Sequence, residues 1–295
     1  MPITIKAHAF WVTPVNGNGD DLKTIAQNFG QNGEDTEFSH RGHDFLCTES
    51  AWHTRRSALT ATVFRLRDSN LPAAVSEDGD VEELPIDDST NLGEPTCFAY
   101  FPDLQVAFIH YSHTGARHTV LPAFLNEIGF AQAIKVEPVI RLDMLERLEN
   151  TDFFTTLEFA LKSPQSIRET RAAEGSVADT LNIMDVLNAE NAHIRITIGY
   201  NRSGGGLSTR TVKDLALGLA HFGDREVSTL KVRGSENADE QVQTLDLLRA
   251  RIVSELEVSD RNREMDRQDC QNKLLRIFEQ NIQSLIEEQL ANNAR

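Results

Sequence analysis

The strongest candidates for chemistry in this chain are basic side chains that could neutralise phosphates. A glycine-rich stretch, residues 201–208, joins a predicted strand to a predicted helix. Backbone N–H groups at a helix start favour anions, and glycines let a phosphate approach closely. Arg202, Arg210 and Lys213 lie in or just after this stretch. Its spacing matches no nucleotide-binding fingerprint, so a phosphate contact and a plain connector both remain open.

A second group of basic residues lies nearer the N-terminus. Arg55, Arg56, Arg65 and Arg67 occupy a stretch without any acidic residue. Such a group is typical either of a phosphate-binding surface or of a solvated face. The chain as a whole is acidic, with a formal net charge of −16, but the acids are unevenly distributed. Residues 68–103 contain many Asp and Glu and no Lys or Arg, so the basic groups could face phosphate while the acids face elsewhere.

The histidines give little support for a metal site. His110 and His113 lie in a histidine-dense segment, but on a strand they would point to opposite faces. Zinc needs three or four ligands that converge on one point, and no partner cysteine or histidine pair has the required spacing. We therefore expect no metal and no cofactor.

One enzymatic alternative stays open. Nuclease chemistry needs acidic metal ligands beside a basic group, and one short stretch provides those types close together: Asp224, Arg225, Glu226 and Lys231. No serine or cysteine lies in a nucleophile signature. The sequence favours a non-enzymatic protein and leaves a metal-dependent nuclease as an alternative.

The elements that carry these residues predict an α+β protein. Residues 57–67 alternate apolar and polar side chains, which indicates a strand. Residues 193–200 alternate strictly, a helix follows over 209–222, and residues 228–234 form another strand. This order predicts a β-α-β region in the C-terminal half, after an N-terminal region with a mixed sheet.

Residues 263–290 predict a long amphipathic helix. Its apolar stripe includes Leu275, Phe278, Ile282 and Leu285. Such a stripe either packs on its own domain or forms the seam of a homodimer.

The length of 295 residues suffices for one large domain or two ordinary ones. We expect a β-rich α+β domain over residues 1–145 and an α/β domain over 146–295 that ends in the long helix. The three cysteines are far apart and form no disulfide framework. With no signal-peptide pattern and no long apolar run, the expected location is the cytoplasm.

Two short segments and the order of the elements resemble RexA-type phage-exclusion proteins and, more distantly, the KwaB component of the Kiwa antiphage system. Gly-Glu-Pro-Thr at 93–96 resembles the Gly-x-Pro that precedes a hairpin in that family. Val-Glu-Pro-Val-Ile-Arg at 136–141 resembles its Ile-Glu-Pro-Leu-Met-Arg segment. The resemblance covers roughly residues 90–290 in outline.

The resemblance implies a homodimer that binds double-stranded DNA with little sequence preference and acts in phage defence. A second defence-system protein, membrane-bound or not, would be a further partner. The two basic groups would supply the phosphate contacts: Arg55, Arg56, Arg65, Arg67, Arg202, Arg210 and Lys213. The main alternative is a protein-interaction subunit of a defence complex, whose acidic segment meets a partner.

Overall fold

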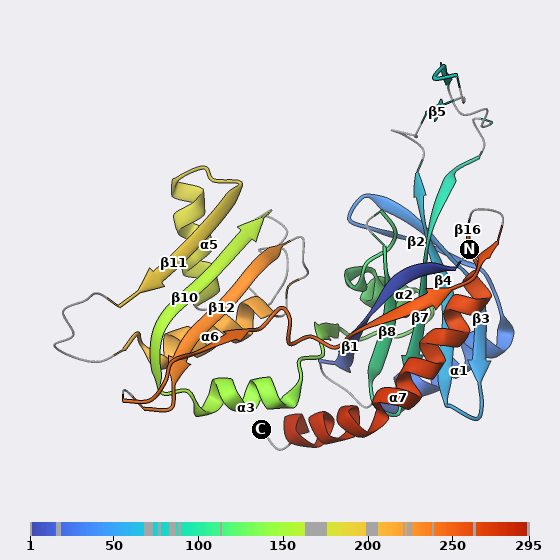
Figure 1. The fold of residues 1–295 in the computed structure, drawn as a ribbon. Coiled ribbons are helices and arrows are strands. Elements are labelled where there is room, and N and C mark those ends of the chain that lie inside the picture. The colour runs from blue at the N-terminus through green and yellow to red at the C-terminus, as the bar shows by residue number, and fades with distance from the viewer. Residues whose placement is uncertain are drawn as a thin grey trace. The chain divides into compact units, whose positions relative to one another are not determined.

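The computed structural model describes residues 2–15, 19–67, 73–75, 78–82, 87, 90–112, 114–162, 176–198, 206–220, 222, 226–237, 239–261 and 264–293. Of residues 281–293 it describes the backbone and not the side chains. The α+β fold class is confirmed, with antiparallel sheets and helices in both halves of the chain (Figure 1).

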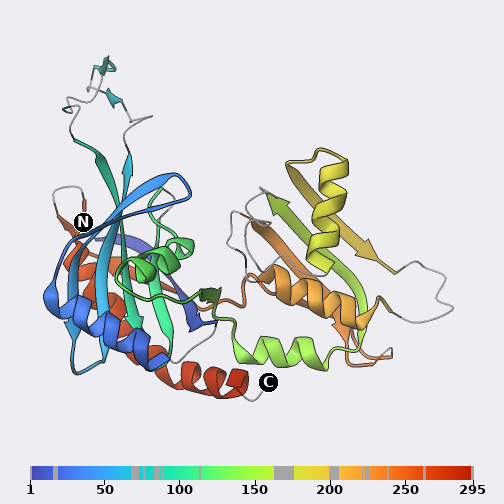
Figure 2. The same cartoon turned by 180° about the vertical axis from the view of Figure 1, so that it is seen from behind.

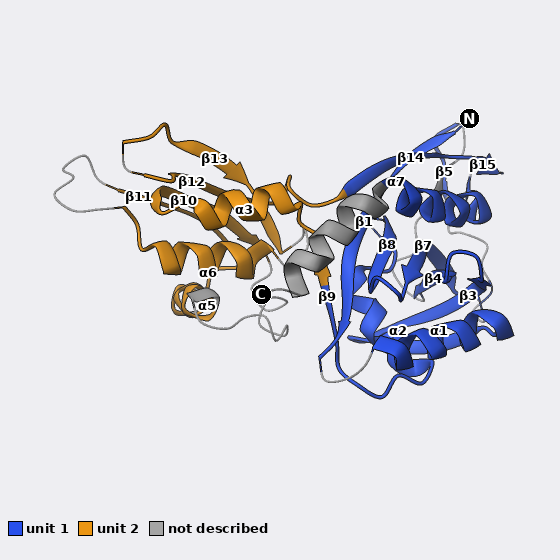
Figure 3. Cartoon of the chain, turned by 90° about the horizontal axis from the view of Figure 1, so that it is seen from below, with its two compact units in different colours: residues 1–136, 253–286 blue, residues 137–252, 287–295 orange. Residues whose placement is uncertain are grey.

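The chain folds into two compact units (Figure 3). Unit 1 comprises residues 1–136 and 253–286, and unit 2 comprises residues 137–252 and 287–295. We had expected a boundary at residue 145 and the long C-terminal helix in the second domain. Residues 253–286 belong to unit 1 instead, because a late strand pairs with the first strand of the chain and the helix packs on the same sheet.

The elements of unit 1, in chain order, are β1 (Ile3–Pro14), α1 (Gly19–Asn32), β2 (Thr36–His40), β3 (His43–His53), β4 (Ala58–Arg67), β5 (Ala74–Val75), β6 (Val81–Glu82), β7 (Leu92–Phe101), β8 (Val106–Tyr111), η1 (His118–Val120), α2 (Leu121–Glu127), β9 (Ile134–Pro138, which crosses the boundary), β14 (Val253–Val258), β15 (Asp260–Arg261), β16 (Glu264–Met265) and α7 (Arg267–Asn293). The strand order of its main sheet is β14-β1-β8-β7-β4-β3-β2, with β9 also on β1. Neighbours along this path are antiparallel.

Helices cover both faces of this sheet. Figure 2 shows α1 and α2 on one face, and Figure 1 shows α7 on the other. The apolar face of α1 is buried as its 3,4 spacing predicts, with Leu22, Ala26 and Phe29 in the core. On the other face, Phe278 of α7 stacks on Phe101 of β7, with ring centroids 3.7 Å apart.

The apolar stripe of α7 is used within the protomer as far as its side chains are described. Leu275 and Phe278 are buried in unit 1, at 2% and 8% exposure. Of the two alternatives for the stripe, a homodimer seam or packing on its own domain, the burial of these two residues supports packing on its own domain. The side chains of Ile282 and Leu285 lie outside the described part of the helix.

The elements of unit 2 are α3 (Leu142–Asn150), β10 (Phe153–Lys162), α5 (Ser176–Val186), β11 (Asn191–Thr197), α6 (Thr209–Ala220), β12 (Val227–Ser235) and β13 (Gln243–Asp246). They form an antiparallel sheet of order β11-β10-β12-β13. Strands β11 and β12 are both antiparallel to β10, so they run parallel to each other, as a connection through α6 requires. The predicted β-α-β region is therefore present in a split form, with β10 inserted between its two strands.

The core of unit 2 lies on one face of this sheet. Leu157 and Phe159 of β10 and Leu230 and Val232 of β12 point towards α5 and α6 and are buried. Figure 2 shows both helices over this face. Since side chains alternate along a strand, every second residue of β10, β11 and β12 points to the opposite face, which we call the open face.

Candidate functional site

The first basic group does not form one surface. Arg55 and Arg56 lie in the turn before β4, whereas Arg65 and Arg67 lie at the far end of the same strand. A strand rises about 3.3 Å per residue, so the two pairs are separated by roughly 30 Å. Residues that are close in sequence are thus far apart, because the chain between them is fully extended.

Three of these four guanidinium groups contact protein groups. Arg56 Nε donates to Glu279 Oε1 on α7 at 2.7 Å. Arg67 Nη1 donates to Glu94 Oε1 on β7 at 2.8 Å, in a half-buried ion pair. Arg65 Nη1 donates to the carbonyl oxygen of Thr114 at 3.3 Å and its Nη2 lies 3.1 Å from a ring nitrogen of a histidine on β3. These contacts connect strands and helices of unit 1, which is a structural role.

The second basic group lies on and before α6. Lys213 Nζ donates to the carbonyl oxygen of Glu149 at 2.5 Å and lies 3.6 Å from Asp152 Oδ1, so it joins α6 to the end of α3. Arg210 is 93% exposed and its nearest acidic partner, Asp214, is 3.9 Å away. Arg202 and the loop from 201 to 205 lie outside the described residues. Of the described members of this group, Arg210 presents its charge to solvent.

The open face of unit 2 gathers basic side chains from three strands. Strand pairing places Arg195 of β11 opposite Glu158 of β10, and Glu158 opposite Lys231 of β12. Arg233 lies two residues further along β12, on the same face. Lys162, at the end of β10, also points to this face. All four basic residues are exposed.

Some charged side chains on the open face form ion pairs with each other, and others do not. Glu158 accepts from His193 at 3.2 Å and lies 3.8 Å from Arg195, so this carboxylate is shared by two neighbours on the edge strand. Within the part of the chain that the structure describes, the side chains of Lys231 and Arg233 form no ion pair within 4.0 Å. Lys231 is flanked by Glu158 and by Asp246 of β13, whereas Arg233 is flanked by Thr156 and Thr244, so Arg233 presents the less compensated charge to an anionic ligand.

Spacing on the open face suits a chain of phosphates. Lys231 and Arg233, two residues apart on one strand, are separated by about 6.7 Å. Arg195 and Lys231 lie on strands separated by one other strand, so they are about 9.6 Å apart. Long flexible side chains at these distances can each reach a different phosphate on one backbone.

Sequence patterns already contained the signal for these residues. In 193–197 the isoleucines alternate with His193, Arg195 and Thr197, so the outward residues are the polar ones. In 228–234 the outward residues likewise include Lys231 and Arg233. What the sequence did not reveal is that β10 lies between them and brings Lys162 to the same face.

His110, His118 and the three cysteines pack within unit 1. His110 is buried in β8, and burial lowers the pKa of its imidazole to about 4. His118 stacks on Phe10 with ring centroids 4.5 Å apart. His113 lies outside the described residues, and among the described ones no group of three or more His, Cys, Asp or Glu is arranged to hold a metal. Cys47, Cys97 and Cys270 are free and buried.

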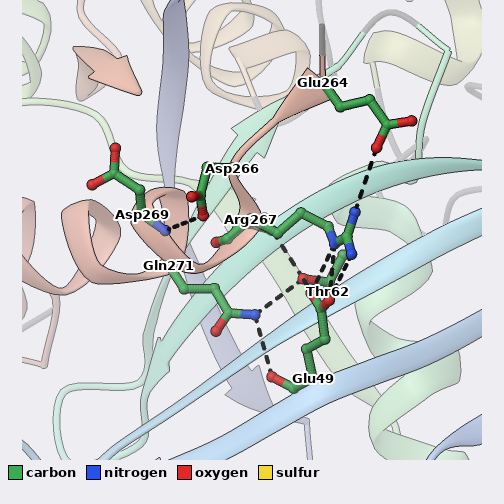
Figure 4. Close-up of polar contacts among 8 residues, drawn as sticks. Glu49, Thr62, Glu264, Asp266, Arg267, Asp269 and Gln271 are labelled. Carbon is green, nitrogen blue, oxygen red and sulfur yellow. Dashed lines mark hydrogen bonds and ion pairs between the residues drawn. The ribbon is translucent and has the colours of Figure 1, made fainter. Parts of the chain in front are cut away.

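A second polar cluster joins the start of α7 to the sheet of unit 1 (Figure 4). Arg267 donates to Glu49 on β3 through Nε at 2.9 Å and through Nη2 at 2.8 Å. Thr62 Oγ1 donates to Glu49 Oε2 at 2.9 Å, and Gln271 Nε2 donates to Thr62 Oγ1 at 3.0 Å. The hydrogen bond from Arg267 is the main cause that lowers the pKa of Glu49.

Asp224 and the adjoining residue 225, proposed as part of a nuclease centre, lie outside the described residues, and the acidic segment 68–103 is described only in part. No described helix combines the length and the apolar composition needed to cross a membrane.

The fold and the sites define an α+β protein of two units, one of which has a basic open sheet face. Residues 19–289 match a protein family described as a family of unknown function, DUF6731, and the chain belongs to this family. No curated protein matches the chain.

Proposed function

We propose that the protein binds double-stranded DNA without sequence preference, through phosphate contacts on the open face of unit 2. The observation that carries this proposal is the convergence of Lys162, Arg195, Lys231 and Arg233 on one exposed face. Contacts to phosphate from Lys and Arg dominate binding that ignores sequence. The acidic character of the rest of the chain then restricts DNA to this face, because like charges repel it elsewhere.

This site differs from the one that the sequence indicated. Arg56, Arg65, Arg67 and Lys213 contact protein groups that hold the fold together, so they are poor candidates for phosphate contacts. Arg210 is exposed but lies on α6, which covers the opposite face of the sheet, and Arg55 is exposed in the turn before β4 of unit 1, so neither belongs to the proposed site.

The biological setting of the proposal is phage defence in the cytoplasm, as a homodimer. Its support is the resemblance to RexA-type and KwaB proteins given above. The described apolar side chains of α7 are buried, so a second copy of the chain would contact another apolar surface. Helix α5 offers one, because Ile183, Val186 and the following Leu187 are 59%, 83% and 69% exposed and lie together on one side.

Fluorescence anisotropy with a short labelled duplex tests the DNA-binding site. The wild-type chain is compared with Lys231→Glu/Arg233→Glu, and with Arg210→Glu as a matched control on α6, which covers the opposite face of the same sheet. We expect the double variant to lose nearly all binding at low salt and Arg210→Glu to bind about as well as the wild type. Equal binding by the double variant and the wild type would rule out the open face.

The same samples separate binding from catalysis. Plasmid DNA is incubated with the protein and Mg²⁺ or Mn²⁺, and nicking is followed on a gel. The proposal expects no nicking in any condition. Metal-dependent nicking that the wild type performs would replace the proposal with the nuclease alternative.

A further inference from the structure

The sheet face under α7 extends beyond the first turn of that helix. Gln271 of α7 contacts Thr62 of β4, and Arg267 is the first residue of the helix. Phe64 and Leu66 follow Thr62 on the same face of β4, at alternate positions. Helix α7 therefore covers β4 only as far as Thr62. Phe64 and Leu66, which follow on the same face, line a cavity instead.

Strand pairing makes the floor of this cavity. Phe64 of β4 lies directly opposite Leu46 of β3 on one side and Pro95 of β7 on the other. Leu66 lies opposite Gly93 in the next row. Directly paired residues of antiparallel strands point to the same face, so these side chains form one apolar surface.

The start of α7 and the preceding β16 make the wall. Met265 and Arg267 line the cavity beside the floor residues, and its volume is about 550 Å³. Cavities of roughly 300–1,000 Å³ hold small organic ligands. Gly93 contributes to this shape, because a Cβ at this position would lie 2.8 Å from Phe64 Cδ1 and push the ring away.

One end of the cavity carries a fixed cation. Glu49 holds Arg267 through Nε and Nη2, which fixes the plane of the guanidinium. The guanidinium carbon lies 5.3 Å from the centre of the Phe64 ring. The remaining nitrogen, Nη1, is 3.9 Å from Glu264, whose side chain is 77% exposed. This contact is loose, so a better-placed anion can replace it.

We propose that this cavity binds a small aromatic carboxylate. The ring of the ligand lies on Leu46, Phe64 and Pro95, and its carboxylate accepts a hydrogen bond from Arg267 Nη1. Two features select this class: an apolar floor that includes the Phe64 ring favours an aromatic body, and a pre-oriented guanidinium favours a planar anion. The site is in unit 1 and does not depend on the proposed DNA-binding face.

Displacement of a fluorescent probe tests the proposal on the full-length chain. Anilinonaphthalene sulfonate, an aromatic anion, reports binding, and naphthoate and its neutral analogue naphthylmethanol compete with it. Because a hydrogen bond to a charged group contributes about 1.5–3 kcal/mol, naphthoate should compete at least about tenfold better than the alcohol. Equal competition by the two compounds would remove the role assigned to Arg267.

Three variants locate the binding. Leu66→Trp fills the cavity and should abolish displacement by naphthoate, while Glu264→Gln removes the competing carboxylate and should strengthen naphthoate binding several-fold. Leu187→Ser removes an exposed apolar residue of unit 2. It should change neither the displacement of the probe by naphthoate nor the affinity for naphthoate. Circular dichroism shows which variants are folded. Unchanged naphthoate binding in folded Leu66→Trp refutes the site; if that variant does not fold, unchanged or weaker binding in Glu264→Gln refutes it.

Discussion

Arg267, the first residue of α7, makes a bidentate ion pair with Glu49, which lies in the β-bulge of β3 with a φ of 54°. A non-glycine residue at positive φ is strained, and such strain persists only where surrounding contacts compensate for it. Arg267, Thr62 and Gln271 supply those contacts, since all three donate to Glu49 or to each other. The ion pair thereby joins the start of α7 to the sheet and orients the guanidinium beside the cavity.

Glu49→Gln should make the stability of unit 1 less sensitive to acid. The hydrogen bond from Arg267 lowers the pKa of Glu49 below its ordinary value of 4.5, so the folded protein holds the carboxylate charged. The charged carboxylate stabilises the fold fully at pH values above the ordinary pKa of Glu49. This stabilisation is lost as the pH falls through the lowered pKa that Glu49 has in the folded protein. We expect the variant to lose about 1 kcal/mol of unfolding free energy at neutral pH, measured by urea denaturation, and less at low pH.

Glu264→Gln is the matched control for this prediction. Glu264 also faces Arg267, but at 3.9 Å and with a largely exposed side chain. Its substitution should leave the unfolding free energy unchanged. A loss as large as that of Glu49→Gln would show that charge near Arg267 matters and the bidentate geometry does not.

Arg67→Ala should lower the stability of the protein, whereas Arg233→Ala should weaken DNA binding. Arg67 is half-buried and pairs with Glu94 at 2.8 Å, so its loss should lower the unfolding free energy by about 1 kcal/mol or more. Arg233 is exposed and unpaired among the described residues, so its loss should leave stability unchanged and weaken DNA binding. Each phosphate contact adds about 0.9 to the slope of log affinity against log salt, so Arg233→Ala should reduce that slope by about this amount.

Thermal denaturation and anisotropy measured on the same two variants check this pair of effects. A loss of DNA affinity in Arg67→Ala without any loss of stability would favour the phosphate-binding role that the sequence suggested for the arginines of β4.

The sequence predicted where the helices and strands lie better than it predicted which strands are adjacent in the sheet. Alternation in 193–197 and 228–234 located β11 and β12 and the helix between them, because a buried face leaves a period-two pattern. The same pattern could not show that β10 lies between these strands. Strand order depends on contacts between residues far apart in sequence, and such contacts leave no local pattern.

The sites illustrate the same limit. Arg55 and Arg65 are close in sequence and far apart in space, since a strand separates them. Glu49 and Arg267 are 218 residues apart in sequence and in contact in space. Neither relationship has a local signature. The C-terminal helix was correctly predicted, but its apolar stripe alone could not distinguish a partner in the same chain from one in a second copy.

His110→Leu should flatten the pH dependence of stability on the acid side of neutrality. Burial lowers the pKa of His110 from 6.5 to about 4, so the folded protein keeps the ring neutral while the unfolded chain takes up a proton. Above pH 6.5 the ring is neutral in both states and costs the folded protein nothing. As the pH falls from 6.5 towards the pKa of about 4 that His110 has in the folded protein, the unfolded chain is favoured and stability is lost. At pH 5 the wild type should lose about 2 kcal/mol from this group.

Urea denaturation at pH 7 and pH 5 measures the difference. The control is His193→Gln, since His193 is exposed and lies on the other unit. A wild-type and a His110→Leu protein with the same loss between the two pH values would contradict the role given to burial.

Phe278→Ala should destabilise the protomer and leave its oligomeric state unchanged. Phe278 is 8% exposed and stacks on Phe101 at 3.7 Å, so truncation removes a buried ring and leaves a cavity between α7 and β7. Such truncations cost about 3–5 kcal/mol. Urea denaturation measures the loss, and light scattering on a sizing column measures the mass in native buffer.

The triple substitution of Ile183, Val186 and Leu187 with Ser is the comparison variant, because these side chains are exposed on α5. It should leave the unfolding of the protomer unchanged and dissociate a homodimer into monomers. If Phe278→Ala instead dissociates a dimer without loss of protomer stability, α7 forms the seam and its burial in unit 1 is not the reason for its apolar stripe.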